Sequence, residues 1–162
     1  MINSDILRRL RYALKFNDKL MLEIFQLGRV ILDKDTLLNH LKKEEEEGYV
    51  PLYPRDMTAF LDGLILKMRG APKTPVTQPV MQENFSNNLV LRKIKIACEF
   101  KEEDLLAILK RGGMELSKSE LSALFRKKDH KNYKECGDQI LRNFLAGLHG
   151  YKKSQPTELK TK

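Results

Sequence analysis

The sequence has only two cysteines and no long apolar run, and both shortages narrow the class of protein. Cys98 and Cys136 cannot build the multi-bridge framework of a small secreted domain. No apolar run approaches the 18 or more residues that a membrane span requires, and the first residues lack the apolar core of a signal peptide. We therefore expect a reduced, cytoplasmic protein without a membrane segment.

Residues that build metal or cofactor sites are also scarce. His40, His130 and His149 occur singly, without the second ligand three or four positions away that a helical zinc site needs. There is no glycine-rich phosphate loop, so we expect no cofactor, no metal and no enzyme activity. One catalytic alternative stays open. Cys136 follows His130 by six positions, and the cations around it would lower the pKa of an exposed thiol.

What the sequence does contain is an internal repeat at an offset of 84 residues. The segment 60–64 reads F-L-D-G-L and the segment 144–148 reads F-L-A-G-L, while Tyr49 falls on Tyr133. The match needs no gap along either half, which indicates a tandem duplication of one unit. Each unit has about 65 residues, a size at which a lone core is marginal. We therefore expect the two copies to pack together.

Apolar residues recur at helical spacing in four segments of each copy, and no segment alternates with the period of a strand. Ser4 and Asp33 are candidate N-caps, and Ser117 with Glu120 forms a capping-box pattern. Gly28 is a candidate for a left-handed C-cap. The sequence predicts an all-α protein built as a tandem duplication of a four-helix unit, with the two copies packed together.

Proline and polar residues mark the predicted boundaries. The first copy occupies residues 1–70 and the second residues 86–150. A Pro-rich linker at 71–85 joins them, and the polar tail at 151–162 is expected to be frayed.

Each copy carries a glycine inside its fourth helical segment, Gly63 in the first and Gly147 in the second. A mid-helix glycine costs roughly 1 kcal/mol against alanine, so another helix is expected to approach closely at each position. Gly147→Leu should then overpack the contact, whereas Gly147→Ala should be mild.

The second half of the chain is the basic half. Residues 86–162 hold 17 basic and 10 acidic side chains, and the whole chain has a net charge of +8. Such an excess favours a phosphate-bearing or acidic partner. The positive charge is densest in a loop of the second copy, where cations surround an aromatic ring and an amide. Binding a phosphate backbone requires such cations, and a base can stack on the ring. The candidate binding residues are Arg126, Lys127, Lys128, His130, Lys131, Asn132, Tyr133 and Lys134, with Arg92 and Lys95 in the first helix of that copy.

The matching loop of the first copy is acidic, with the run Glu44–Glu47 at the positions of Lys128–Lys131. This run would repel phosphate, so nucleic acid should bind the second copy. Alternatively, the acidic loop contacts the basic loop of another molecule or of its own chain, which would make the protein an adaptor or a homo-oligomer. A charged loop that is simply solvated is the common case.

Two further basic features leave a binding role open. Arg8, Arg11 and Lys15 lie at i, i+3 and i+7 on one face of the first helix and would line a backbone-binding groove. The second and third helices of the second copy, joined through Gly112 and Gly113, would suit a helix-turn-helix. Ordinary exposed helix faces and generic helical hairpins are the more frequent explanation of both features.

Three motifs together resemble the bacterial YehS family. They read K-K-E-E-E-E-G-Y, F-L-D-G-L and D-H-K-N-Y-K-E-C-G-D-Q-I-L-R-N-F-L-A-G-L, and the resemblance extends from Asn3 to Leu148. It implies a duplicated helical domain in a bacterial, cytosolic protein and supplies no catalytic residue. Family members often carry a first-loop cysteine where this chain has Leu52, opposite Cys136, so a role for paired cysteines is not implied. The sequence favours a non-catalytic binding module for RNA or DNA, with an adaptor or self-associating protein as the alternative.

Overall fold

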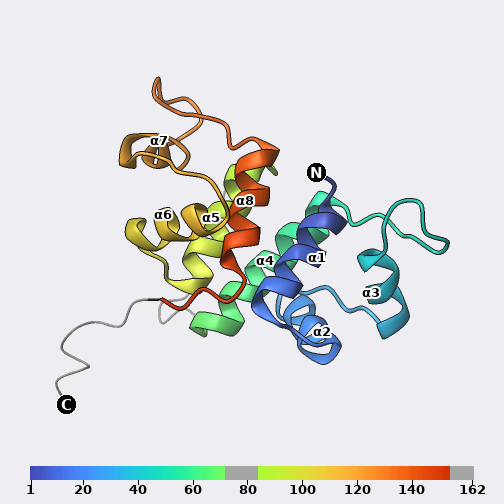
Figure 1. The fold of residues 1–162 in the computed structure, drawn as a ribbon. Coiled ribbons are helices and arrows are strands. Elements are labelled where there is room, and N and C mark those ends of the chain that lie inside the picture. Colours follow the sequence, from blue (N-terminus) through green and yellow to red (C-terminus); the bar gives the residue numbers. More distant parts are fainter. Residues whose placement is uncertain (72–83, 154–162) are drawn as a thin grey trace, which may run out of the picture.

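Eight α-helices make up the computed structural model, which describes residues 1–71 and 84–153 (Figure 1). The first copy contains α1 (Asn3–Leu14), α2 (Asp18–Leu27), α3 (Lys34–Leu41) and α4 (Pro54–Arg69). The second copy contains α5 (Asn87–Cys98), α6 (Glu102–Arg111), α7 (Lys118–Ala123) and α8 (Asp138–Leu148). The described ranges hold no strand, and each helix of the second copy begins 84 residues after its counterpart. The predicted all-α duplication is confirmed.

Local side-chain chemistry explains most of the helix starts. The Ser117 hydroxyl accepts from the Glu120 N–H at 3.0 Å, and the Glu120 carboxylate accepts from the Ser117 N–H at 2.9 Å, which confirms the capping box. Asp33 caps α3 by accepting from the Thr36 N–H at 2.8 Å. The predicted cap at Ser4 is wrong, because Ser4 lies within the first turn of α1 and is fully buried.

The two copies pack against each other through two pairs of helices, each pair taking one helix from each copy. Helix α4 packs along α5, and the equivalent α8 packs along α1, so the four lie at the centre of the molecule with α2 and α3 on one side and α6 and α7 on the other (Figure 1). This reciprocal packing relates the copies by an approximate two-fold. Buried apolar side chains from both copies, including Phe60 and Phe144, form one cluster. The expected packing of the copies on each other is confirmed. No helix in the described ranges is long and apolar enough to cross a membrane.

Glycines let two helix pairs meet backbone to backbone. A Cβ atom on Gly147 would lie 1.8 Å from the carbonyl oxygen of Ile108 in α6. A Cβ atom on Gly63 would lie 1.9 Å from the carbonyl oxygen of Ile24 in α2. The close approach predicted at both glycines is confirmed. The prediction that Gly147→Ala is mild is wrong, because even a methyl group overlaps a backbone atom that cannot rotate away.

Gly28 and Gly112 lie on the opposite side of the same contacts. A Cβ atom would meet the carbonyl oxygen of Ala59 at 1.9 Å from Gly28 and that of Asn143 at 1.8 Å from Gly112. Gly28 has a φ of −83°, and Arg29 after it has the left-handed φ of 70°. The predicted left-handed cap at Gly28 is therefore wrong, and the glycine is needed for the close approach instead.

The second copy continues past its predicted end. The Tyr151 hydroxyl donates to Asp104 at 2.5 Å, and the Tyr151 ring meets the Phe100 ring edge-on at 5.8 Å. A frayed tail starting at Tyr151 is therefore wrong for its first residues. Most of the predicted linker (72–83) and the rest of the tail (154–162) lie outside the described residues.

Candidate nucleic-acid interface

Most of the candidate binding residues lie in one loop between α7 and α8, here called the basic loop (residues 126–134), which projects from the molecule beyond α7 (Figure 1). Most of its side chains are exposed, while Arg126 and Tyr133 are half-buried. The loop has five cationic side chains, which are Arg126, Lys127, Lys128, Lys131 and Lys134. None of them forms an ion pair within the described part of the chain. Their charges are therefore available to an external anion.

Backbone hydrogen bonds give the basic loop a defined shape. The His130 N–H donates to the Lys127 carbonyl at 2.9 Å, and the Tyr133 N–H donates to the His130 carbonyl at 3.0 Å. The Lys134 N–H then donates to the Ala123 carbonyl at the end of α7, also at 3.0 Å. These bonds make two successive turns closed onto a helix, so the cations are displayed on a folded backbone.

A side chain of α5 bonds to the backbone just before the basic loop, at its last residue and just after it. The Asn88 Nδ2 donates to the carbonyls of Leu124 and Lys134, each at 2.9 Å. Its Oδ1 accepts from the Cys136 N–H at 2.9 Å. The three hydrogen bonds of this amide thus go to backbone groups at or next to the ends of the loop and position it. Sequence reasoning missed Asn88, since its only signal was an amide at the position equivalent to Ser4.

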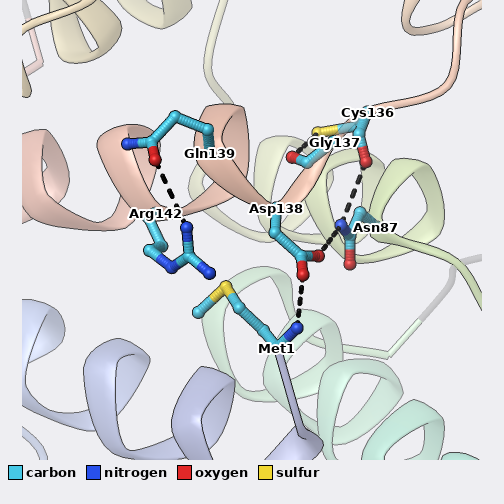
Figure 2. Close-up of polar contacts among 7 residues, drawn as sticks. All are labelled: Met1, Asn87, Cys136, Gly137, Asp138, Gln139 and Arg142. Carbon is cyan, nitrogen blue, oxygen red and sulfur yellow. Dashed lines mark hydrogen bonds and ion pairs between the residues drawn. The ribbon is translucent and has the colours of Figure 1, made fainter.

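The C-terminal end of the loop is also tied to the first copy. Figure 2 shows Asp138, at the start of α8, between the Asn87 side chain and the α-amino group of Met1. The Asp138 carboxylate accepts from Met1 at 2.5 Å and from Asn87 at 2.8 Å, and Asn87 also donates to the Cys136 carbonyl at 3.0 Å. The bond from the ammonium group and then the bond from Asn87 lower the pKa of Asp138. Residues of both copies therefore hold the segment 136–138 that follows the basic loop, here called the loop root.

Arg92 and Lys95 lie on α5 beside this root, and both are half-buried. The Lys95 Nζ lies 5.7 Å from the centre of the Phe125 ring, next to Arg126. Arg8, the counterpart of Arg92, donates to two carbonyls at the end of α3 at 3.0 and 2.8 Å. The structure thus brings Lys95 to the start of the loop and places Arg92 one turn earlier on the same helix.

Cys136 and His130 have environments that do not suit nucleophilic chemistry. Cys136 is buried, and burial followed by the nearby Asp138 carboxylate raises the pKa of its thiol to about 11. His130 is exposed, and its Nδ1 accepts from the Asn132 N–H at 3.0 Å. The condition for a lowered thiol pKa, exposure of Cys136, is therefore not met. Within the described ranges, no three side chains of metal-binding type come together.

The other two basic features are less suited to nucleic acid than the loop. The connection between α6 and α7 runs over six residues, 112–117, and α7 itself has only six residues. A tight helix-turn-helix has a turn of about three or four residues, so that hypothesis is wrong. In the α1 stripe, Arg8 pairs with Asp5 and Arg11 pairs with Asp18. Their charge is largely neutralised within the chain.

The equivalent loop of the first copy, here called the acidic loop (residues 42–50), has the same backbone. The three hydrogen bonds that shape the basic loop recur there at the equivalent positions, with N···O distances of 3.0, 3.2 and 3.1 Å. The two loops project from different sides of the molecule (Figure 1), and no hydrogen bond or ion pair joins them among the described residues. The intramolecular pairing of the loops considered from the sequence is therefore wrong.

Comparison with known proteins places this fold among relatives without an assigned activity. The model of the family "Protein of unknown function (DUF1456)" matches the chain at residues 3–70 and 87–153, which are the two structural copies. A curated relative, "Uncharacterized protein YehS" of Escherichia coli (strain K12), is 41% identical over 149 residues. The aligned region covers 91% of this chain and 94% of the relative, so the resemblance seen in the motifs is confirmed. No solved structure matches the chain.

Proposed function

The chain belongs to the DUF1456 family, whose name carries no activity, and from its own surface we propose that it is a non-catalytic module that binds single-stranded RNA or DNA through the basic loop. One observation supports this most. Five cations without an ion pair within the described part of the chain share a loop whose backbone is hydrogen-bonded into shape. A phosphate that binds there meets cations on a backbone that is already folded, so the backbone of the loop adds little ordering cost to binding.

Charge and ring chemistry both suit a single strand. Between residues 126 and 131 the loop carries four cations and one aspartate, a net +3 with His130 neutral. Such a cluster attracts a polyphosphate backbone and exchanges its counterions. Tyr133 and the exposed Asn132 amide lie within the same loop and supply a stacking face and a hydrogen-bonding edge for an unpaired base.

Fluorescence anisotropy with a short labelled RNA at several salt concentrations tests the proposal. On single strands, log affinity falls by about 0.7 per log unit of salt for each phosphate contact, so four contacts give a slope near −3. A Lys127→Ala/Lys128→Ala variant should flatten the slope by roughly one to two units and weaken all sequences alike. The matched control is Lys42→Ala/Lys43→Ala, which removes the same charge from the acidic loop and should leave the slope unchanged. Failure to bind RNA or DNA at low salt would overturn the proposal.

A second candidate function, self-association, is favoured by the two loops themselves. They share a backbone shape, carry opposite charge and project from different sides of the molecule (Figure 1). The acidic loop of one molecule therefore complements the basic loop of the next, in a head-to-tail contact. Sedimentation at low salt should show mass growing with concentration, and replacing Glu44–Glu47 by lysine should abolish the growth. A constant monomer mass would remove this candidate without affecting the first.

A further inference from the structure

The two copies form a groove at the end of the α1–α8 pair that lies away from the basic loop. Its volume is about 710 Å³, and it is lined by the basic face of α1 and by His149, which follows α8. Ligand pockets commonly measure about 300–1,000 Å³ and often lie where domains meet. Helix α8 has 11 residues, so about 16 Å separates this groove from the loop root at the other end of the helix. The groove is thus separate from the proposed nucleic-acid interface.

Two aromatic rings from different copies form one wall of the groove. Tyr12 is 68% exposed, yet its ring stacks on the His149 ring with a centroid distance of 4.4 Å and an interplanar angle of 17°. The Nδ1 atom of His149 is buried and has no hydrogen-bond partner among the described residues. A large exposed ring held flat by a second ring is a platform for stacking.

The charge of the groove is positive and is concentrated on one free side chain. Arg8 and Arg11 face the groove, but each also pairs with an aspartate of the first copy. Lys15 closes α1 with a left-handed φ of 58°, is exposed and forms no ion pair in the described part of the chain. Lys15 is therefore the cation of the groove whose charge is most available to an anion.

The equivalent positions on the other side of the approximate two-fold lack this chemistry. Ile96 stands at the position of Tyr12, Ile65 at that of His149 and Glu99 at that of Lys15. Arg92 and Lys95 stand at the positions of Arg8 and Arg11, so two cations recur, but two aliphatic side chains and an acid replace the stacked rings and Lys15. Among the described residues, the ring platform with a lysine beside it is therefore not repeated at the equivalent positions.

We propose that this groove binds a mononucleotide, with the base stacked on Tyr12 and the phosphate at Lys15. The ring platform, the free cation and the volume together fit a planar base that carries a phosphate, whereas inorganic phosphate alone would leave the platform unused. The nucleotide is either free or the terminal unit of a strand. This site does not depend on the basic loop, so the two proposals fail separately.

Calorimetric titration with adenosine 5′-monophosphate tests the groove, with adenosine and inorganic phosphate as partial ligands. Tyr12→Ala should weaken binding about 5- to 150-fold, the equivalent of one stacked base. Its control is Tyr53→Ala, which removes a tyrosine of similar exposure (65%) outside the groove and should change nothing. Lys15→Gln should weaken the nucleotide but not adenosine, and Lys19→Gln, the same charge change on α2, should not.

The imidazole resonances of His149 give an independent reading, because they must shift when the nucleotide stacks beside the ring. A 5′-phosphorylated oligonucleotide that competes with the mononucleotide, when the 5′-hydroxyl form does not, identifies a strand end as the source. The free nucleotide is the source if neither oligonucleotide competes. No binding at millimolar nucleotide, or equal binding by the Tyr12→Ala variant, would overturn the proposal. Loss of RNA binding in the Lys127→Ala/Lys128→Ala variant would have no bearing on it.

Discussion

Equivalent loops of the two copies carry opposite charge on the same backbone. Residues 42–47 hold two lysines and four glutamates, a net −2, whereas residues 126–131 have a net +3. Three backbone hydrogen bonds recur between them at an offset of 84. The turns depend on main-chain bonds, so the exposed side chains can change sign without changing the fold. Any functional difference between the copies therefore lies in the surface that the shared fold presents.

The attachment of the two loops differs as well. In the first copy the Ser4 hydroxyl lies 3.5 Å from the Tyr49 hydroxyl, at the limit of a hydrogen bond. In the second copy the equivalent residue, Asn88, makes three bonds of 2.9 Å to the loop backbone. The acidic loop is held instead by Arg8, which donates to the Leu41 and Lys42 carbonyls at 3.0 and 2.8 Å, and by the His40 ring, whose Nδ1 lies 2.9 Å from the Val50 carbonyl oxygen. Side chains anchor both loops, and the residues that do so differ between the copies.

The largest loss of stability is expected at the helix–helix contacts of Gly63 and Gly147, which are the same in both copies. Gly63→Ala and Gly147→Ala each place a methyl group within 2 Å of a backbone oxygen of the facing helix. Overpacking commonly costs 1–3 kcal/mol, and since the clash is with backbone we expect about 3 kcal/mol or more from each substitution. Urea unfolding should show similar losses for both. Gly137→Ala is the control, because nothing lies within 4 Å of the added atom. A large loss in one copy alone would break the structural equivalence of the repeats.

This contact shows which features a sequence can predict. The 84-residue offset and the helical glycines pointed to duplicated helices in close contact, because periodicity and helix propensity are local properties. The role of Gly28 could not be predicted, since a glycine after a helix serves a turn or a close approach equally well. Ser4 has a side chain suited to capping, and only the surrounding core shows that it is buried.

The candidate site was predicted in part for the same reason. The cations of one loop are close together in the sequence, so their cluster can be predicted, and in the structure they lie in the same loop. The contact between Asn88 and the loop joins residues 36 to 48 positions apart, so no local pattern reveals it. The groove at Tyr12 and His149 joins opposite ends of the chain and depends on how the copies pack.

The next largest effect tests the different roles of Asn88 and Ser4 in anchoring the two loops. Asn88→Ala removes three hydrogen bonds to the loop, each with a net value of about 0.5–1.5 kcal/mol, so we expect a loss of about 2 kcal/mol in stability. Ser4→Ala at the equivalent position should cost far less. Thermal unfolding measures both, and anisotropy should show weaker RNA binding only for Asn88→Ala. Equal losses at the two positions would mean that Ser4 and Asn88 contribute alike to holding their loops.

A smaller effect compares the aromatic residues of the two loops. Tyr133→Ala should weaken RNA binding by about 1 kcal/mol, the low end of base stacking, because the ring is half-buried. The slope against salt should stay unchanged, since no cation is lost. Tyr49→Ala, at the same position in the acidic loop, should leave RNA binding intact. A change of slope on removing Tyr133 would show that the variant disturbs the cations and not a stacked base.

The smallest effect concerns the dependence of stability on pH at the C-terminal attachment of the basic loop, where the second copy has the carboxylate of Asp138. Asp138 stands at the position of Pro54, and its pKa is lowered by the Met1 ammonium group and then by Asn87. A lowered folded-state pKa stabilises the fold above the unfolded value of about 3.9, and this stability is lost as pH falls through the folded value. Because the Asp138 side chain is 43% exposed, the contribution should not exceed about 1 kcal/mol.

Asp138→Asn should therefore reduce the free energy of unfolding at pH 7, and the difference from the unmodified protein should vanish near pH 2. Urea unfolding at both pH values measures this. Asp129→Asn, which removes an exposed aspartate of the basic loop without an ion-pair partner in the described ranges, is the control and should behave the same at both pH values. A loss at pH 7 that persisted at pH 2, where Asp138 is neutral, would show that the effect does not come from the charge of the carboxylate. The attachment of the loop to the first copy would then not depend on charge.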